Sequence, residues 1–230
     1  MQLFYLENPK DEIILSTEES KHATKVLRKQ EGDILNFTDG KGYFYKAEIT
    51  VAETRKCRLK VVSTEQKPKQ HKYHLHIAIA PTKNMDRFEW FLEKATEIGI
   101  DEITPIICSR SERKVIKTER CNRILLSAMK QSLKFHLPKL NEAITLKDFL
   151  KQDFEGNKYI AHCKEGDKIE LREEEKSEKT TILIGPEGDF SPSEIELALQ
   201  NQFKAVSLGT SRLRTETAGL MAVHTINLKH

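Results

Sequence analysis

Two glycine-containing segments near the carboxyl end of the chain hold the residue types that could bind a small ligand and act on it. The first, from Ile184 to Glu194, reads Ile-Gly-Pro-Glu-Gly-Asp-Phe-Ser-Pro-Ser-Glu, and the second, from Leu208 to Ala218, contains two arginines and a glutamate. Glycine lets a backbone turn sharply and approach a ligand closely. Arginine and glutamate supply charged donors and a base for acid–base chemistry. The spacing fits neither a dinucleotide fingerprint nor a Walker loop, which argues against both classes of site.

Each segment is predicted to join a strand to a helix. Thr181–Ile184 is a fully apolar strand, and the capping-box pattern that begins at Ser191 predicts the start of the next helix. Ala205–Leu208 is predicted as the following strand, and Thr215 can cap the closing helix. Open α/β sheets bind ligands at the carboxyl ends of their strands. The two junctions therefore predict the walls of one pocket.

The chain from residue 73 onward alternates between strand and helix patterns. Apolar runs predict strands at 74–80, 103–108 and 159–163, and apolar spacing predicts helices at 84–99, 118–135 and 192–200. The charged run 164–179 is predicted as a surface loop, because alternating charges bury poorly. This alternation indicates an α/β domain with a mostly parallel sheet that is covered on both faces.

Strand patterns dominate the first part of the chain. A capping box at Ser16 predicts a helix that places Ala23, Val26 and Leu27 on one face and is stopped by Gly32. The glycines of residues 39–42 predict a hairpin turn. The polar segment 66–72 is typical of a linker. We therefore expect a small barrel-like domain over residues 1–68 and a second domain over residues 73–230.

Composition limits the class of protein. The 230 residues carry a net charge of +3, with 38% hydrophobic and 32% charged residues. No signal-like leader and no membrane-length apolar run are present, so we expect a cytoplasmic protein without membrane insertion. The four scattered cysteines predict reduced thiols rather than disulfides or a zinc site. His71, His74 and His76 lie close together, but we interpret them as a polar edge between domains and expect no metal.

Basic residues concentrate in the middle of the chain. Between residues 110 and 139 there are nine lysines and arginines but only two acidic residues. Such a stretch is typical of a surface that binds a polyanion. It is equally typical of the solvated face of a helix, and the stretch by itself does not separate these interpretations.

Several motifs together resemble one family. Ile184–Gly188, paired with Leu208–Gly209 and Leu213–Ala218, is similar to motifs of the ribosomal RNA small subunit methyltransferase E family of the SPOUT superfamily. The similarity extends to His22–Arg28, Lys94–Gly99, Arg110–Ser111, and Gln131 followed by Pro138, so it covers nearly the whole chain. The resemblance implies a PUA-like RNA-binding β-barrel and a trefoil-knotted SPOUT domain with a parallel sheet. A knot is not something that general folding rules would predict.

The resemblance also implies an activity and its residues. Family members use S-adenosylmethionine to methylate N3 of a uridine in 16S ribosomal RNA of the small subunit, and they act as homodimers. The implied cofactor-binding residues are Leu183, Ile184, Gly185, Glu187, Gly188, Leu208, Gly209, Leu213, Arg214, Thr215 and Ala218. With an RNA substrate, we expect the following residues to bind the RNA: His22, Lys25, Arg28, Arg110, Arg113, Gln131 and Lys134. This chain departs from the family pattern at Asp189, where a glycine is frequent, and at Lys134, where an arginine is frequent; lysine keeps the charge but lacks the planar fork that makes two parallel hydrogen bonds.

The chemistry of such a reaction suggests roles for the charged residues. Uridine N3 carries a proton at neutral pH, so the enzyme must stabilise a uridine anion whose charge spreads onto the two ring oxygens. Arg214 or Arg212 is the candidate stabiliser, and Glu216 or Glu187 is the candidate base. The alternative is that Arg214 forms a structural ion pair with a glutamate.

Two other functions remain open at this point. A related SPOUT enzyme that methylates a ribose hydroxyl of transfer or ribosomal RNA would bind the same cofactor. A non-catalytic ribosome-assembly protein would use the barrel and the basic stretch but would not need the two glycine segments.

Overall fold

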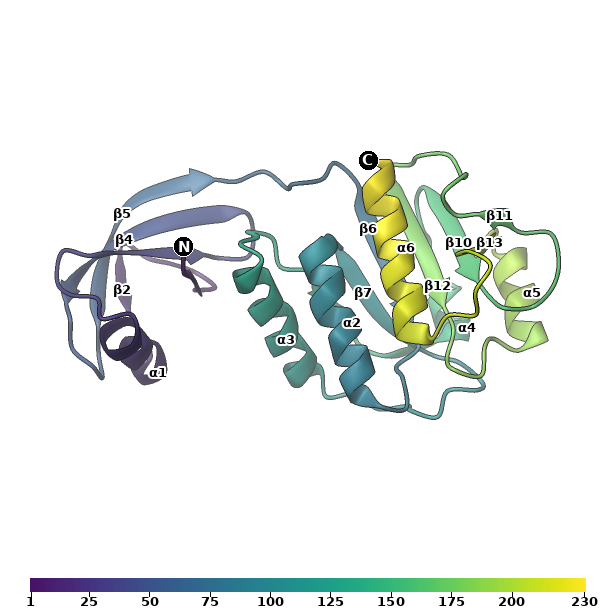
Figure 1. The fold of residues 1–230 in the computed structure, drawn as a ribbon, viewed down its shortest axis with the longest axis horizontal. Coiled ribbons are helices and arrows are strands. Elements are labelled where there is room, and N and C mark those ends of the chain that lie inside the picture. Colours follow the sequence, from purple (N-terminus) through teal and green to yellow (C-terminus); the bar gives the residue numbers. More distant parts are fainter. The chain divides into compact units, whose positions relative to one another are not determined.

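The computed structural model describes all residues from 1 to 230 and divides into two compact units. Met1–Lys69 and Met129–Leu137 form the first unit, and Gln70–Ala128 and Pro138–His230 form the second. Figure 1 shows the elements of both units along the chain. No helix is long and apolar enough to cross a membrane.

A five-stranded sheet forms the body of the first unit. Its order is β1 (Leu3–Tyr5), β3 (Ile34–Thr38), β4 (Tyr43–Val51), β5 (Arg58–Gln66) and β2 (Glu12–Ile14). Only the β1–β3 pair is parallel. Phe4, Phe37, Ile49 and Leu59 are among the apolar side chains that fill the core on one side of this sheet. The predicted hairpin turn joins β3 to β4, and the carboxylate of Asp39 accepts hydrogen bonds from the backbone N–H groups of Lys41 and Tyr43.

The first helix differs from its prediction. Ser16 caps α1 (Thr17–Lys21) as expected, but the chain then widens into a π-helix over His22–Val26. This wider turn rotates Val26 away from the core, so that its side chain is 68% exposed while Ala23 is fully buried. Arg28, with φ of 54°, ends the helical segment well before Gly32. The predicted apolar face was therefore wrong at Val26, and so was the predicted end of the helix.

An eight-stranded parallel sheet forms the second unit. The order of the main path is β11 (Ile169–Glu170), β13 (Lys204–Ser207), β10 (Asn157–Ala161), β12 (Lys179–Ile184), β6 (His74–Ile79), β7 (Glu102–Ile107) and β8 (Lys139–Leu140), and β9 (Ile144–Thr145) also pairs with β7. Every pairing is parallel. The predicted α/β class with a parallel sheet is confirmed.

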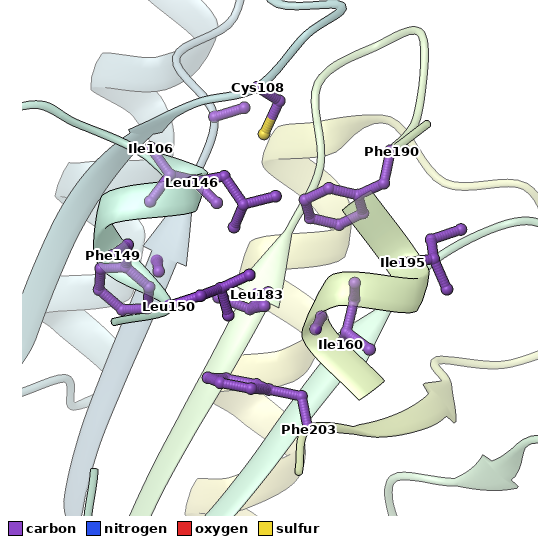
Figure 2. Close-up of a cluster of buried hydrophobic side chains, with 13 residues drawn as sticks. Ile106, Cys108, Leu146, Phe149, Leu150, Ile160, Leu183, Phe190, Ile195 and Phe203 are labelled. Atoms are coloured by element: carbon purple, nitrogen blue, oxygen red, sulfur yellow. The ribbon is translucent and has the colours of Figure 1, made fainter. Parts of the chain in front are cut away.

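Helices cover both faces of this sheet. Helix α6 (Thr215–Lys229) packs on β6 and β12, and α2 (Met85–Ile98) packs against α6 (Figure 1). Gly219 permits this close packing, because an added Cβ would lie 2.8 Å from the ring of Phe91 and 2.9 Å from Ile79 Cδ1. On the other face, α4 (Leu146–Phe149) and α5 (Pro192–Gln200) bury the apolar cluster of Figure 2, which includes Phe149 and Phe190.

Two further predictions need correction. Helix α3 (Thr118–Gln131) ends four residues before the predicted Phe135, because Leu133 adopts a φ of 55°. The charged run 164–179 is more than a surface loop: β11 pairs with β13, and Leu171 is buried. Glu174 accepts hydrogen bonds from Tyr159 and Lys204, which anchors the run to the sheet.

The histidines of β6 are not equivalent. His76 is only 6% exposed, its Nε2 lies 2.7 Å from Thr104 Oγ1, and its ring packs against Phe149. It is a core histidine, so the interpretation as a polar edge between domains was wrong for this residue. No cluster of three or more potential metal-binding side chains is present. All four cysteines are free thiols.

Burial of His76 predicts an acid sensitivity. Desolvation lowers the pKa of His76 to about 4, against a smaller opposing effect of Glu102. The unfolded chain then binds one more proton between about pH 6.5 and 4, so stability is fully present above pH 6.5 and falls as the pH drops through this window. The loss by pH 4 is about 3 kcal/mol.

Denaturant unfolding at several pH values measures this effect. His76→Gln, which keeps a hydrogen-bonding group for Thr104, should reduce the pH slope of the free energy of unfolding by up to about 1.4 kcal/mol per pH unit. His74→Gln is the matched control, because His74 lies on the same strand but its side chain is 42% exposed, and it should keep the wild-type slope. An unchanged slope in His76→Gln would contradict the assignment.

Candidate active site

The candidate site lies where three neighbouring strands end. β13, β10 and β12 are adjacent in the sheet and parallel, so the loops that follow them meet at one edge. Two cavities open there. The first has a volume of about 370 Å³ and is lined by the ends of β10 and β13 and the loop 208–213. The second, of about 220 Å³, is lined by the loop 184–189 and by residues 212–215.

The two cavities are neighbours with a common wall. Ala161, Cys163, Arg212, Leu213 and Ala218 line both. Ligand pockets of small-molecule size usually occupy about 300–1,000 Å³, so the pair offers room for a nucleoside with an attached chain. The wall is partly apolar and partly charged, as such pockets usually are.

Most of the implied cofactor-binding residues line these cavities. Leu208 and Gly209 line the first; Ile184, Gly185, Glu187, Arg214 and Thr215 line the second; and Leu213 and Ala218 line both. Two do not. The Leu183 side chain lies in the apolar core (Figure 2), and Gly188 packs under Arg110.

Thr215 joins the two glycine segments. Its Oγ1 donates a hydrogen bond to the carbonyl of Gly185 at 3.0 Å, and the hydroxyl is buried. Arg214, and not Thr215, is the N-cap residue of α6, and no side chain caps that helix. The prediction that Thr215 caps the helix was therefore wrong. The hydroxyl instead fixes the start of α6 against the end of β12.

The first glycine segment is held at its far end as well. Ser191 and Glu194 form the predicted capping box of α5, which is confirmed. The Glu194 carboxylate also accepts hydrogen bonds from the backbone and the hydroxyl of Ser109. Burial raises the pKa of Glu194, but the hydrogen bonds from Ser191 and Ser109 outweigh it and hold that pKa below its usual value. The anionic form therefore persists to lower pH and keeps the loop in place.

Asp189, at which the resemblance predicted glycine, adopts a backbone conformation that suits glycine. Its φ is 62°, in the left-handed region that aspartate tolerates better than most residues. One carboxylate oxygen accepts a hydrogen bond from the N–H of Phe190, and the other accepts one from the N–H of Cys163. Asp189 therefore ties the loop after β12 to the end of β10.

The second glycine segment depends on Gly209. Its φ is 114°, a conformation that side-chain-bearing residues rarely adopt, and nothing lies within 4 Å of the position an added Cβ would take. The backbone at Gly209 therefore borders the first cavity with no side chain in between, and its N–H and carbonyl are held by hydrogen bonds with the Ser207 hydroxyl.

The candidate catalytic residues occupy different surroundings. Arg214 lines the second cavity and forms no ion pair or side-chain hydrogen bond. Glu216 is 7% exposed and lines neither cavity; its Oε1 lies 3.9 Å from Arg87 Nε, and its Oε2 has no hydrogen-bond partner. Glu187 lines the second cavity, where its Oε1 accepts a hydrogen bond from the N–H of Lys83. The alternative pairing of Arg214 with a glutamate does not occur.

The end of β10 forms a wall that the sequence analysis missed. Ala161, His162 and Cys163 line the first cavity. The strand itself was predicted, but its place between β12 and β13 depends on pairings that single-sequence patterns do not encode. Burial lowers the pKa of His162, and its Nδ1 has no hydrogen-bond partner.

The predicted RNA-binding residues divide between the two units. Arg110 and Arg113 lie in the second unit and donate hydrogen bonds to backbone carbonyls. The other five, His22, Lys25, Arg28, Gln131 and Lys134, lie in the first. Their role as RNA contacts stays a prediction.

Comparison with known proteins supports one family across the whole chain. An RNA methyltransferase domain model matches residues 69–227, and an RNA methyltransferase PUA domain model matches residues 15–62. The Ribosomal RNA small subunit methyltransferase E of Rickettsia conorii is 31% identical, over 96% of this chain and 91% of that protein.

Two solved structures share the fold. A probable rRNA-methyltransferase from Porphyromonas gingivalis is 43% identical with a TM-score of 0.93, and the match covers 99% of both chains. A Ribosomal RNA small subunit methyltransferase E from Neisseria gonorrhoeae bound to S-adenosyl methionine is 28% identical with a TM-score of 0.86, over 97% of this chain and 95% of that one. The expected SPOUT-type fold with a PUA-like amino-terminal domain is confirmed. The sequence motifs, the parallel sheet with its two cavities and these matches agree, and the chain belongs to the ribosomal RNA small subunit methyltransferase E family of RNA methyltransferases.

Proposed function

We propose that this protein uses S-adenosylmethionine to methylate N3 of a uridine in 16S ribosomal RNA of the small subunit. The observation that carries the proposal is the pair of adjoining cavities at the ends of β10, β12 and β13. Family membership and the relative bound to S-adenosyl methionine support the choice of cofactor.

The residues around the cavities fit this cofactor. Gly209 lets a ligand approach the backbone closely where a Cβ would otherwise project. Apolar residues such as Leu213 and Ala218 lie beside the charged Arg212 in the shared wall, which suits a ligand with an aromatic base and a charged amino-acid end. When bound, the cofactor supplies an activated methyl group together with its leaving group.

The residues of the chain must make the nucleophile, uridine N3, reactive by removing its proton and stabilising the resulting anion. We assign to Arg214 the donation of hydrogen bonds to a ring oxygen of the uridine anion, because Arg214 lines the second cavity and its side chain has no internal partner. Glu187 lines the same cavity and is a candidate to accept the N3 proton. Glu216 is the other candidate, since its Oε2 is buried without a partner.

The remaining features of the family complete the proposal. We assign residues 1–68 to a PUA-like RNA-binding domain and residues 73–230 to a trefoil-knotted methyltransferase domain. The RNA phosphates are contacted by basic residues of both, and the enzyme works as a homodimer in the cytoplasm. A mildly basic protein with a concentrated basic stretch suits a ribosomal RNA substrate.

Primer extension on small-subunit RNA tests the reaction. N3-methyluridine blocks the pairing edge of the base and arrests reverse transcription, so cells without this protein should lose one stop, and the wild-type gene should restore it. A ribose methyl leaves base pairing intact. Loss of a ribose methyl instead of a stop would identify the ribose-methylating alternative, and loss of neither would indicate a non-catalytic role.

A further inference from the structure

Arg110 makes contacts that a simple phosphate-binding residue does not need. It lies just after β7, and its Nη1 donates to the carbonyl of Gly188 at 2.8 Å and to that of Phe190 at 3.4 Å. Its methylene chain packs over Gly188, where an added Cβ would lie 3.4 Å from Arg110 Cβ. The Arg110 side chain therefore contacts the first glycine segment in two ways. Its guanidinium hydrogen-bonds to two backbone carbonyls, and its methylene chain packs on Gly188.

Neighbouring contacts join the same two stretches of chain. Ser109 donates two hydrogen bonds to Glu194, at the far end of the glycine segment. Arg113 donates through Nε and Nη2 to the carbonyl of Lys83, and the N–H of Lys83 donates to Glu187. Residues 109–113 are therefore attached to both ends of the loop 187–194, with Arg110 in the middle.

The position of this loop matters for the second cavity. Gly185, Pro186, Glu187 and Asp189 all line that cavity. Asp189 has a positive φ, which is a costly conformation for a residue with a side chain. Removing the Arg110 donor would leave the Gly188 carbonyl without this charged partner, and hydrogen bonds from charged donors are among the stronger ones.

We propose that Arg110 is a positioning residue of the cofactor loop and not an RNA contact. The inference rests on the proposed function, since it assumes that the second cavity receives part of the cofactor. Arg110 acts by holding the Gly188 and Phe190 carbonyls, which keeps the loop 185–190 in its binding conformation. Lys114, four residues along, lines a separate cavity with Arg113 and forms no hydrogen bond or ion pair, so it is available to a phosphate.

Two substitutions in the full-length protein separate these roles. Arg110→Gln should raise the Kd of S-adenosylmethionine, measured by calorimetry, by about tenfold. The salt dependence of RNA binding by the cofactor-free protein should stay as in wild type. Lys114→Gln is the matched control: it removes one positive charge from the same stretch, and should weaken RNA binding and reduce the salt slope by about one while cofactor affinity is unchanged.

Arg110→Lys tests whether the guanidinium itself, and not only its positive charge, holds the loop. It keeps the charge and most of the methylene chain but loses the planar fork, so its cofactor affinity should fall between those of wild type and Arg110→Gln. Thermal unfolding without cofactor identifies any variant that has lost its fold; if Arg110→Gln unfolds, Arg110→Lys decides the question. A changed salt slope with unchanged cofactor affinity in the Arg110 variants would overturn the proposal. If the wild-type protein itself binds no S-adenosylmethionine, the proposed function fails and the assignment of Arg110 to the cofactor loop fails with it.

Discussion

Replacing Arg214 by alanine is expected to lower the turnover number by about 10²- to 10³-fold, the usual effect of removing one donor that stabilises a developing anion. Arg214 lines the second cavity and has no internal ion pair that its loss would break. The fold should therefore remain intact, and saturating cofactor should offset any loss of cofactor affinity. Single-turnover methylation of small-subunit particles at saturating cofactor measures the chemical step directly.

Arg212 provides the comparison for this experiment. Arg212 lines both cavities and is the other candidate stabiliser. If Arg214 acts on the uridine anion, Arg212→Ala should lower turnover much less than Arg214→Ala, and Arg214→Lys should recover only part of the rate because it lacks the paired donors. Near-normal turnover in Arg214→Ala would remove Arg214 from the mechanism, and a large loss in Arg212→Ala alone would transfer the role to Arg212.

Gly209→Ala is expected to weaken cofactor binding without any direct clash. The φ of 114° is strained for alanine, although the space around the new Cβ is open. The strain costs about 1–3 kcal/mol, so the loop of the variant should relax to another conformation. Binding of the cofactor must then return the loop to its present conformation, and this costs binding free energy. The Kd should rise by about 5- to 150-fold, as measured by calorimetry.

Gly32→Ala is the matched control for this prediction. Gly32 also has a positive φ, of 88°, with nothing within 4 Å of an added Cβ, but it lies in the first unit. Both variants should lose a similar amount of stability, and only Gly209→Ala should lose cofactor affinity. Equal affinities in the two variants would show that Gly209 does not shape the cofactor site.

The two glycine segments could be predicted because their information is local. Strand, glycine turn and capping box follow one another within Ile184–Glu194, and the structure shows the capping box at Ser191 as expected. The parallel sheet followed from alternating strand and helix patterns. These features depend on residues that are close together in the sequence.

The features that could not be predicted depend on tertiary contacts. The Thr215 hydroxyl bonds to Gly185, thirty residues away, instead of capping its own helix. Leu171 is buried within a strongly charged run because β11 reaches an edge of the sheet beside β13. His162 and Cys163 become part of the site only because β10 lies between β12 and β13. In each case the partner lies far along the chain, so composition and periodicity carried no signal for it.

The π-helix at His22–Val26 shows a different limit. The sequence satisfies an α-helical apolar pattern, yet the wider turn leaves Val26 exposed. Arg28 then takes a left-handed conformation that usually favours glycine or asparagine. The residue types in this segment predict neither the π-helix nor the left-handed conformation of Arg28.

Titration of S-adenosylmethionine into the purified protein, followed by calorimetry, tests the central claim most directly. We expect saturable binding with one site per chain, weakened by Gly209→Ala and preserved in Gly32→Ala. A protein that takes up no S-adenosylmethionine, either alone or together with small ribosomal subunits, would contradict the claim that the loops after β12 and β13 form a cofactor site.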